Sequence, residues 1–223
     1  MRAFFFVLML LSHMNASFAQ DWAQLNYFKE ANAQLLPPEP NENRVVFLGN
    51  SITEGWLNVK PGPFDNPQYI NRGIGGQTTP QMKIRFWQDV IQLQPKTVVI
   101  LAGINDIAQN TGYIPVPEIA QNIEEMAELA KSYGIKVVIC SVLPANVFPW
   151  RPQIYPADKV IELNALLMTY AKTHGHTFLD YYSSMVNDEK GMIAAYTTDG
   201  VHCTEAGYRV MEQMVHDILQ KIQ

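Results

Sequence analysis

The chain has 223 residues, of which 48% are hydrophobic and 17% charged, with a net charge of -5 and a pI near 5.5. This length and composition predict one globular domain, because the chain can bury one substantial core but is short for two. The 16 lysine and arginine residues are scattered rather than gathered into a basic stripe, which argues against a nucleic-acid-binding protein.

The first 19 residues have the pattern of a secretory signal peptide. One positive charge at Arg2 precedes an apolar run from Ala3 to Leu11, and Ser17 and Ala19 are small residues at the spacing of a cleavage site. The run is too short to span a bilayer, and it lacks the periodicity of a packed helix. No cysteine follows it at the cleavage site, so a lipoprotein anchor is not indicated. We therefore expect a mature protein that begins near Gln20, works in the periplasm or outside the cell, and has no stable membrane anchor.

The rest of the chain predicts an N-terminal helix and linker at 20–42 and one domain at 43–223. Apolar residues recur at helical spacing from Asp21 to Leu35, and the stretch LPPEPNENR then ends the helix. We expect this helix to pack on the outside of the domain. Within the domain, strand and helix patterns alternate. Strands are expected at 44–48, 68–71, 97–101, 136–140 and 176–179, and helices at 79–93, 116–133, 157–173 and 204–222.

Short apolar strands such as TVVIL and KVVIC are typical of a parallel sheet that is covered on both faces. The alternating helices supply the crossover connections that parallel strands require. The sequence therefore predicts an α/β protein, namely a three-layer α/β/α sandwich around a five-stranded, mainly parallel sheet.

The most irregular stretch is the loop at 143–156, LPANVFPWRPQIYP, which is rich in proline and aromatic residues. Two interpretations of its rings stay open. Trp150 and Tyr155 offer flat apolar faces that could bind substrate in a cleft, or the rings could simply pin the loop to the domain.

Four polar clusters occupy connections between the predicted elements. They are Asn50-Ser51 after the first strand, Gly73–Thr78 after the second, Asn105-Asp106 after the third, and Asp199–His202 before the last helix. Ligands of a parallel sheet bind beyond the carboxyl ends of its strands, so we expect these clusters to lie together. Taken singly, each residue also has an ordinary interpretation as a helix cap, a turn residue or a surface side chain.

The side-chain types in these clusters complement one another chemically. A serine hydroxyl is a weak nucleophile until a base such as a neutral imidazole removes its proton. The imidazole in turn needs a carboxylate that fixes its tautomer and stabilises its charged form. Ser51, His202 and Asp199 supply these groups. Charge that develops on a substrate oxygen needs N–H donors, each worth about 3 to 4 kcal/mol of barrier, and Gly76 and Asn105 carry candidate amides.

In content and order, the clusters resemble the four sequence blocks of the SGNH hydrolases, the GDSL esterase and lipase family. The blocks read FLGNSITEG, INRGIGGQT, LAGINDI and DGVH, and they extend over most of the mature chain. The resemblance implies the flavodoxin-like fold of that family, with Ser51 as nucleophile and Asp199 and His202 as its catalytic partners. It also implies an oxyanion hole formed by the Ser51 amide, Gly76 and Asn105. No cofactor is implied.

One position departs from the family pattern, because Asn50 stands where the family usually has aspartate. Asparagine keeps a hydrogen-bond acceptor but loses the negative charge. Since the resemblance places the catalytic carboxylate at Asp199, we expect the exchange to change the hydrogen bonds beside Ser51 and to affect rate and pH optimum without removing the mechanism. Asp106 is expected to have a structural role around the Asn105 turn.

Other known motifs are not met. Thr53 stands where the nucleophile elbow of α/β-hydrolases has its second glycine, the Gly73–Gly76 turn lacks the third glycine of a dinucleotide site, and no Walker lysine is present. The remaining histidines lack ligand partners at suitable spacing, so no metal site is predicted. Cys140 and Cys203 match no metal motif either, and they are expected as two free thiols, with a disulfide as the alternative.

Together these patterns predict an exported serine esterase that works through an acyl-enzyme. We expect small-molecule or carbohydrate esters with short acyl groups, above all acetyl, because the mature chain is compact and carries an aromatic loop of the kind on which sugars stack. Two alternatives stay open. A lysophospholipase or thioesterase would need an apolar acyl channel, and a non-catalytic glycan-binding domain would bind without hydrolysis. Activity that depends on a neutral histidine is expected to rise with pH through about 6.5.

Overall fold

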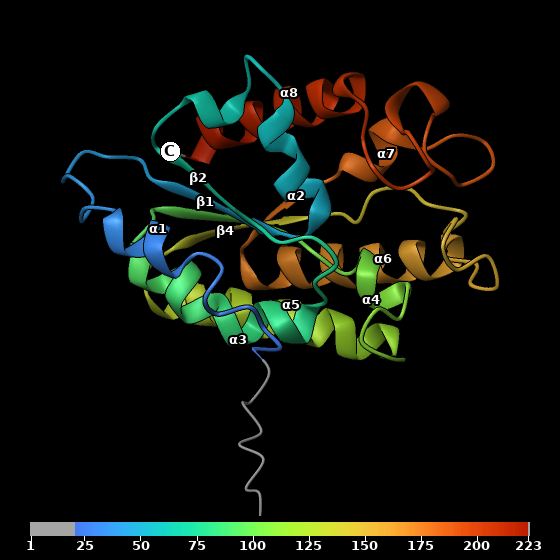
Figure 1. Cartoon of the computed structure of the whole chain (residues 1–223), viewed down its shortest axis with the longest axis horizontal. Helices are drawn as coiled ribbons and strands as arrows, with labels where there is room; N and C mark the ends of the chain where they lie inside the picture. Colours follow the sequence, from blue (N-terminus) through green and yellow to red (C-terminus); the bar gives the residue numbers. More distant parts are fainter. Residues whose placement is uncertain (1–20, 223) are drawn as a thin grey trace, which may run out of the picture.

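The computed structural model describes residues 21–222, so the predicted signal peptide at 1–19 lies outside the described residues. Its centre is a five-stranded sheet in the order β2-β1-β3-β4-β5 (Figure 1), in which all neighbouring strands are parallel. The strands are β1 (Val45–Gly49), β2 (Tyr69–Gly73), β3 (Thr97–Leu101), β4 (Lys136–Cys140) and β5 (Thr177–Leu179). The predicted α/β/α sandwich is confirmed, and the sheet is entirely parallel.

Helices cover both faces of the sheet. As Figure 1 shows, one layer contains α3 (Thr79–Asp89), α5 (Val116–Ser132) and α6 (Ala157–His174). The other contains α2 (Ser51–Gly55), α7 (Tyr181–Met185) and α8 (Glu205–Ile222). The short helix α1 (Lys29–Gln34) lies at the periphery, whereas all four residues of the short helix α4 (Ile104–Ile107) are buried. Turns of 3-10 helix occur at Trp56–Asn58, Pro63–Asp65, Ile91–Leu93 and Ala194–Tyr196.

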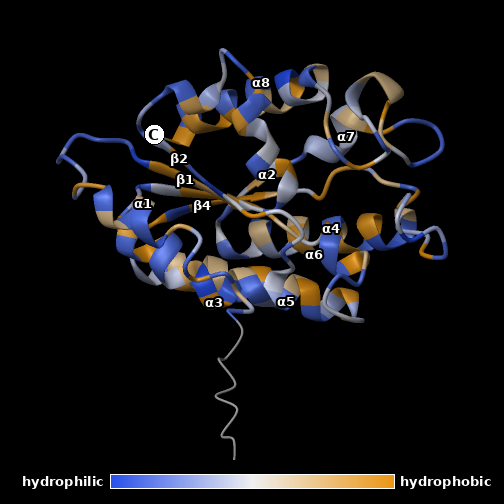
Figure 2. Cartoon of the chain, viewed as in Figure 1, coloured by the Kyte–Doolittle hydropathy of each residue, from blue (hydrophilic) through white to orange (hydrophobic). Residues whose placement is uncertain are grey.

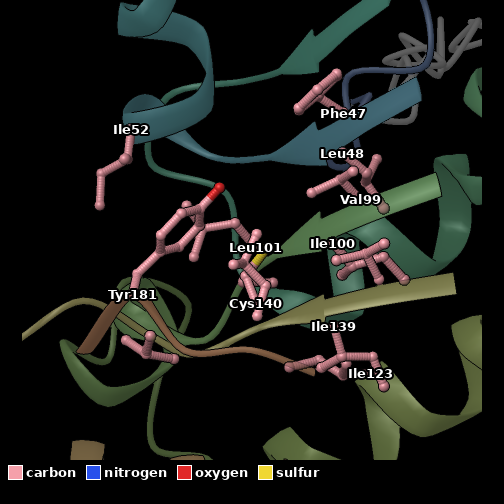
Figure 3. Close-up of a cluster of buried hydrophobic side chains, with 14 of the residues drawn as sticks. Phe47, Leu48, Ile52, Val99, Ile100, Leu101, Ile123, Ile139, Cys140 and Tyr181 are labelled. Atoms are coloured by element: carbon pink, nitrogen blue, oxygen red, sulfur yellow. The ribbon is translucent and has the colours of Figure 1, made fainter. Parts of the chain in front are cut away.

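The core lies between the sheet and the two helix layers. Every residue of β1 and β3 is buried, as expected for central strands with a helix layer on each face. Figure 2 shows hydrophobic residues concentrated on the strands and on the helix faces that turn toward them. In Figure 3, side chains of the central strands pack with Ile52 of α2, Ile123 of α5 and Tyr181 of α7. Full burial of such a side chain contributes about 1.5 to 3 kcal/mol.

The two cysteines are buried free thiols, as the first interpretation predicts. Burial raises the pKa of both, and that of Cys203 reaches about 12. Neither thiol therefore has the lowered pKa of a reactive cysteine.

The N-terminal helix is much shorter than the apolar spacing predicts, since only Lys29–Gln34 is helical. The preceding residues form turns instead. Gln24 adopts a positive φ of 56°, which a continuous right-handed helix does not accommodate. The Asp21 carboxylate accepts hydrogen bonds from the backbone of Leu25 and Asn26 and stabilises the turns.

Three glutamine side chains hold these turns against the domain. Gln77, Gln81 and Gln88 each donate a hydrogen bond from Nε2 to a backbone oxygen of the segment, namely those of Ala23, Trp22 and Leu25. Helix α1 itself contacts α3 (Figure 1). The segment therefore packs on the outside of the domain, as expected, but through specific polar contacts rather than through a long amphipathic helix.

A fully buried ion pair joins α3 to the sheet. The Arg85 and Asp89 side chains are 0% exposed and 3.0 Å apart, one helical turn from each other. Arg85 also donates from Nη2 to the backbone oxygen of Gly49 at the end of β1, and from Nε to Oε1 of Gln77. One guanidinium thus connects a helix, the end of a central strand and the loop that follows β2.

Replacing Arg85 with alanine is expected to destabilise the protein strongly. The variant leaves the Asp89 carboxylate buried without its cation and removes the Arg85 donors to Gln77 and to the Gly49 carbonyl, and breaking a buried pair costs about 3 to 5 kcal/mol. Urea denaturation of the wild type and Arg85→Ala measures this difference. Lys83→Ala, which removes a cation from the same helix at a partly exposed pair with Glu125, is the control and is expected to lose at most about 1 kcal/mol. Equal losses in the two variants would contradict the role of Arg85.

Candidate active site

The strand order places the end of β1 at a switch point of the sheet. Along the chain β2 is added on one side of β1, whereas β3, β4 and β5 are added on the other. Connections leaving β1 and β3 therefore diverge to opposite sides, and such a point is where parallel sheets bind ligands. Ser51 follows β1 and Asn105 follows β3.

Ser51 is the first residue of α2, but the helix is capped by its neighbour. Oδ1 of Asn50 accepts a hydrogen bond of 3.1 Å from the backbone N–H of Ile52. The turn is tight, because a Cβ on Gly49 would lie 2.0 Å from Oγ1 of Thr53. The Ser51 hydroxyl is therefore free to contact another group, and its Oγ lies 3.0 Å from Nε2 of His202.

Asn50 thus performs with its amide oxygen the capping role that an aspartate could also perform. The side chain is 1% exposed, and its Nδ2 has no hydrogen-bond partner within the described part of the chain. An aspartate here would remove that unpaired donor but would place a carboxylate in a buried position.

Asp199 orients His202 through both of its carboxylate oxygens. Oδ1 accepts hydrogen bonds from the backbone N–H groups of Val201 and His202, and Oδ2 lies 2.7 Å from Nδ1 of the His202 ring. Since the carboxylate can only accept, Nδ1 carries the ring proton and Nε2 is left as the acceptor for the Ser51 hydroxyl. Burial works to raise the pKa of Asp199, but the hydrogen bonds from His202 and Val201 outweigh it and hold the pKa below its ordinary value.

Helix α8 fixes the histidine loop relative to α2. The Tyr208 hydroxyl donates a hydrogen bond of 2.9 Å to the backbone oxygen of Ile52, and its ring stacks on Trp56 with centroids 5.7 Å apart. The His202 and Asp199 side chains remain 39% and 34% exposed, so the group formed with Ser51 is open to solvent.

Gly76 lies in the loop after β2 and Asn105 in the short helix α4, and hydrogen bonds join these two parts of the chain. Gly76 has a φ of +76°, which favours glycine, and its carbonyl accepts a hydrogen bond from Nδ2 of Asn110. The Asn105 side chain is buried and donates from Nδ2 to the backbone oxygen of Gln77 at 3.0 Å. A side-chain amide has a second N–H, so one donor of Asn105 remains for another acceptor.

Asp106 has the structural role that the sequence suggested, and it acts on the start of α3. Its carboxylate accepts hydrogen bonds from the backbone N–H and the Oγ1 hydroxyl of Thr79. The carboxylate is buried, and burial raises its pKa to about 6 although the Thr79 bonds oppose this. Asp106 therefore holds the loop that carries Gly76 against the Asn105 turn.

The two aromatic residues singled out in the 143–156 loop lie in different surroundings. The Trp150 ring is 5.9 Å from the His202 ring, between centroids, and is 43% exposed. Phe148 is fully buried beneath it, with centroids 5.4 Å apart, and pins the loop. Tyr155 is 81% exposed, and no ring contact or hydrogen bond within residues 21–222 joins it to Ser51 or His202. The interpretation that the rings pin the loop therefore applies to Phe148, whereas substrate binding by Trp150 or Tyr155 stays a prediction.

Arg85 and Gln77 are the supporting residues that sequence reasoning missed. They join the strand end before Ser51 to the loop of Gly76, and Gln77 also accepts from Asn105 through its backbone oxygen. The only sequence signal was an arginine four residues before an aspartate, at a helix position where an apolar residue is expected. That spacing is usual on exposed helix surfaces, so the pattern alone did not indicate burial.

Comparisons with known proteins agree with this fold. A sequence model of the GDSL-like Lipase/Acylhydrolase family matches residues 47–210. The chain is similar to a crystal structure from Bacteroides fragilis described as an acylhydrolase, with 50% identity and a TM-score of 0.88 over 91% of this chain and 99% of that chain. The fold also resembles an acetyl xylan esterase, at 17% identity and a TM-score of 0.66 over 78% and 98% of the two chains.

Two curated proteins are also similar. The uncharacterized lipoprotein YqeF of Bacillus subtilis is 30% identical over 117 residues, 45% of this chain, and the match spans about half (48%) of that relative. The isoamyl acetate-hydrolyzing esterase of Saccharomyces cerevisiae is 22% identical over 215 residues, 80% of this chain and 85% of that protein.

The fold and the family match define an α/β enzyme of the acylhydrolase class. The chain belongs to the GDSL-like lipase and acylhydrolase family, within the SGNH hydrolase superfamily. Among residues 21–222, no helix is both long enough and apolar enough to cross a bilayer.

Replacing Asp106 with asparagine is expected to change how stability depends on pH. The pKa of Asp106 is about 6 in the folded protein, against 3.8 for an ordinary aspartate, so between these values the folded state holds a proton that the unfolded chain releases. The free energy of unfolding therefore falls as pH rises through this window, by on the order of 3 kcal/mol for this group.

Melting temperatures measured from pH 4 to pH 7 test this. As pH rises, the melting temperature of the wild type is expected to fall by several degrees relative to that of Asp106→Asn. Asp188→Asn, an exposed aspartate with no hydrogen bond described for its side chain, controls for the change in net charge. A pH-independent difference would contradict the raised pKa.

Proposed function

We propose that the protein is an exported serine esterase in which Ser51 attacks the ester carbonyl and forms an acyl-enzyme. One observation carries the proposal: hydrogen bonds of 3.0 and 2.7 Å join Ser51 to His202 and His202 to Asp199. Nucleophile, base and orienting carboxylate are thereby aligned, with the base in the tautomer that accepts the serine proton.

The reaction then proceeds in two halves. His202 takes the proton of Ser51 as Oγ bonds to the carbonyl carbon, and Asp199 stabilises the imidazolium that forms. The backbone N–H groups of Ser51 and Gly76 and the second side-chain N–H of Asn105 hold the oxyanion. His202 then protonates the leaving alcohol. In the second half it activates a water molecule, which releases the acid and restores the serine.

The proposed substrates are short-chain acyl esters, above all acetyl esters of carbohydrates. Three observations support this choice. The His202 and Asp199 side chains are open to solvent, and the exposed Trp150 ring beside His202 is of the kind on which a sugar stacks. Two similar proteins, the yeast esterase and the acetyl xylan esterase, act on acetyl esters. Export is supported by the pattern of residues 1–19 and by the similarity to a lipoprotein.

Replacing Ser51 with alanine is expected to lower kcat for 4-nitrophenyl acetate by about a thousandfold or more, because the nucleophile is lost and only the oxyanion donors and binding remain. The melting temperature is expected to change little, since Asn50 rather than Ser51 caps α2. Ser184→Ala, an exposed serine in α7, is the matched control and is expected to keep full activity. A Ser51→Ala variant with full turnover would rule out the serine mechanism.

A chain-length series of 4-nitrophenyl esters tests the substrate proposal. We expect kcat/KM to be highest for acetate and to fall at least about tenfold by octanoate, a difference of ~1.4 kcal/mol in transition-state binding. Acetate release from a panel of O-acetylated polysaccharides is measured alongside. A kcat/KM that rises with chain length favours the lysophospholipase or thioesterase alternative, and binding of these glycans without hydrolysis favours the non-catalytic one.

A further inference from the structure

A second carboxylate lies beside the proposed nucleophile. Glu54 is three residues after Ser51 in α2 and is partly buried. A Cβ built on Gly75, which precedes the oxyanion candidate Gly76, would lie 2.9 Å from Oε2 of Glu54 and 3.9 Å from Cβ of Ser51. Glu54 and Ser51 therefore both lie beside the Gly75 backbone, where the lack of a side chain lets the Glu54 carboxylate approach closely.

Glu54 is held by a residue from the N-terminal segment. The Tyr27 hydroxyl donates a hydrogen bond of 2.8 Å to Oε1 of Glu54. This bond raises the pKa of Tyr27, so the hydroxyl keeps the proton that it donates. Oε2, the oxygen on the Gly75 side, has no hydrogen bond described within residues 21–222. One carboxylate oxygen is thus fixed and the other remains an acceptor.

The position of Tyr27 is itself fixed by the domain. The Ala23 and Leu25 carbonyls before it accept from Gln77 and Gln88, and the Phe28 ring after it lies under the Arg72 guanidinium at 4.6 Å. Tyr27 and Glu54 are therefore held in place before any ligand arrives, which lowers the entropy cost of binding to them.

The site has an apolar ring on one side and a charged carboxylate on the other. At His202, Trp150 presents an apolar ring, whereas at Gly75, Glu54 presents an unpaired acceptor with negative charge. A carboxylate can only accept hydrogen bonds, so it suits an alcohol portion that carries hydroxyl groups. It also repels an anionic substrate group, and this repulsion is strong within a few ångströms in a partly buried position.

We propose that Glu54, positioned by Tyr27, is a specificity-determining residue that favours neutral, hydroxyl-bearing alcohol portions and disfavours anionic ones. This inference rests on the proposed esterase function and names the substrate class of that same site. A sugar acetate with free hydroxyls satisfies both conditions, because Oε2 accepts one hydroxyl while the Trp150 face covers the ring.

The test compares kcat/KM for four acetate esters. They are 4-nitrophenyl acetate, which has no free hydroxyl, a mono-O-acetylated methyl xyloside, a mono-O-acetylated methyl glucuronoside, which is anionic, and acetylcholine, which is cationic.

The variants separate charge from hydrogen bonding, since Glu54→Gln removes the charge but keeps an acceptor, whereas Glu54→Ala removes both. Tyr27→Phe removes only the hydroxyl that holds Glu54. Glu39→Gln, an exposed glutamate before β1 at the opposite end of the strand from Ser51, is the matched charge control.

We expect the wild type to prefer the xyloside ester over the glucuronoside ester. Glu54→Gln is expected to raise the ratio of glucuronoside to xyloside kcat/KM about tenfold, because the repulsion is removed. Glu54→Ala is expected to lower the ratio of kcat/KM for the xyloside ester to kcat/KM for 4-nitrophenyl acetate about tenfold, because a hydrogen bond to a charged group is lost. Tyr27→Phe is expected to lower that second ratio by a smaller factor, and Glu39→Gln is expected to change neither.

Ratios that stay within twofold of wild type in both Glu54 variants would overturn the inference while leaving the esterase function intact. A wild-type preference for acetylcholine over the xyloside ester that disappears in Glu54→Gln would also overturn it, because the carboxylate would then serve a cation. A wild type that hydrolyses none of the four esters is a different result and would overturn the proposed function itself. Because ratios between substrates are compared within each variant, partial loss of folded protein cancels.

Discussion

The arrangement of the whole site depends on one buried charge. The Arg85 guanidinium, shielded completely from solvent, donates to the carbonyl at the end of β1, to Gln77 on the loop after β2, and to Asp89 on its own helix. Burial lowers the pKa of Arg85, and the Asp89 carboxylate opposes that shift. Desolvating such a pair is costly, and the cost is offset only when every donor finds an acceptor. The strand that precedes Ser51 and the loop that carries Gly76 are therefore fixed relative to each other by a rigid, planar group.

The other parts of the site are connected to Arg85 through further hydrogen bonds. Gln77, held by Arg85, accepts the Asn105 amide through its carbonyl and reaches the N-terminal segment through its side chain. The same segment carries Tyr27 to Glu54, one helical turn beyond Ser51. On the far side, Tyr208 of α8 anchors the histidine loop to Ile52 of α2. Asn105 and the α2 backbone are thus supported by buried polar contacts from distant parts of the chain, whereas the Tyr27 contact to Glu54 is exposed to solvent.

The sequence predicted the sheet well and the supporting contacts poorly, for a physical reason. The strands at 97–101 and 136–140 agree with the structure because continuous apolar runs are hard to place anywhere but in a covered sheet. The helix expected from Asp21 to Leu35 is largely turns, since tertiary hydrogen bonds from glutamines outweigh a weak local propensity. Ser51, Asp199 and His202, which the structure brings into hydrogen-bond contact, can be singled out in the sequence because they lie within short motifs. Arg85, Tyr27 and the free oxygen of Glu54 gain their meaning only from contacts between distant residues, which no local pattern records.

The shared use of one guanidinium also constrains how such a protein can evolve. A lysine at position 85 would present a single nitrogen to acceptors that Arg85 now meets with three. An apolar residue there would leave the Asp89 carboxylate buried without its cation, with only neutral amide donors such as that of Asn32. A change at position 77, 85 or 89 alone therefore removes a partner from this set and lowers the stability of the fold. Across divergent descendants of this chain, these three positions should change as a set, while the loops around the substrate remain free to vary.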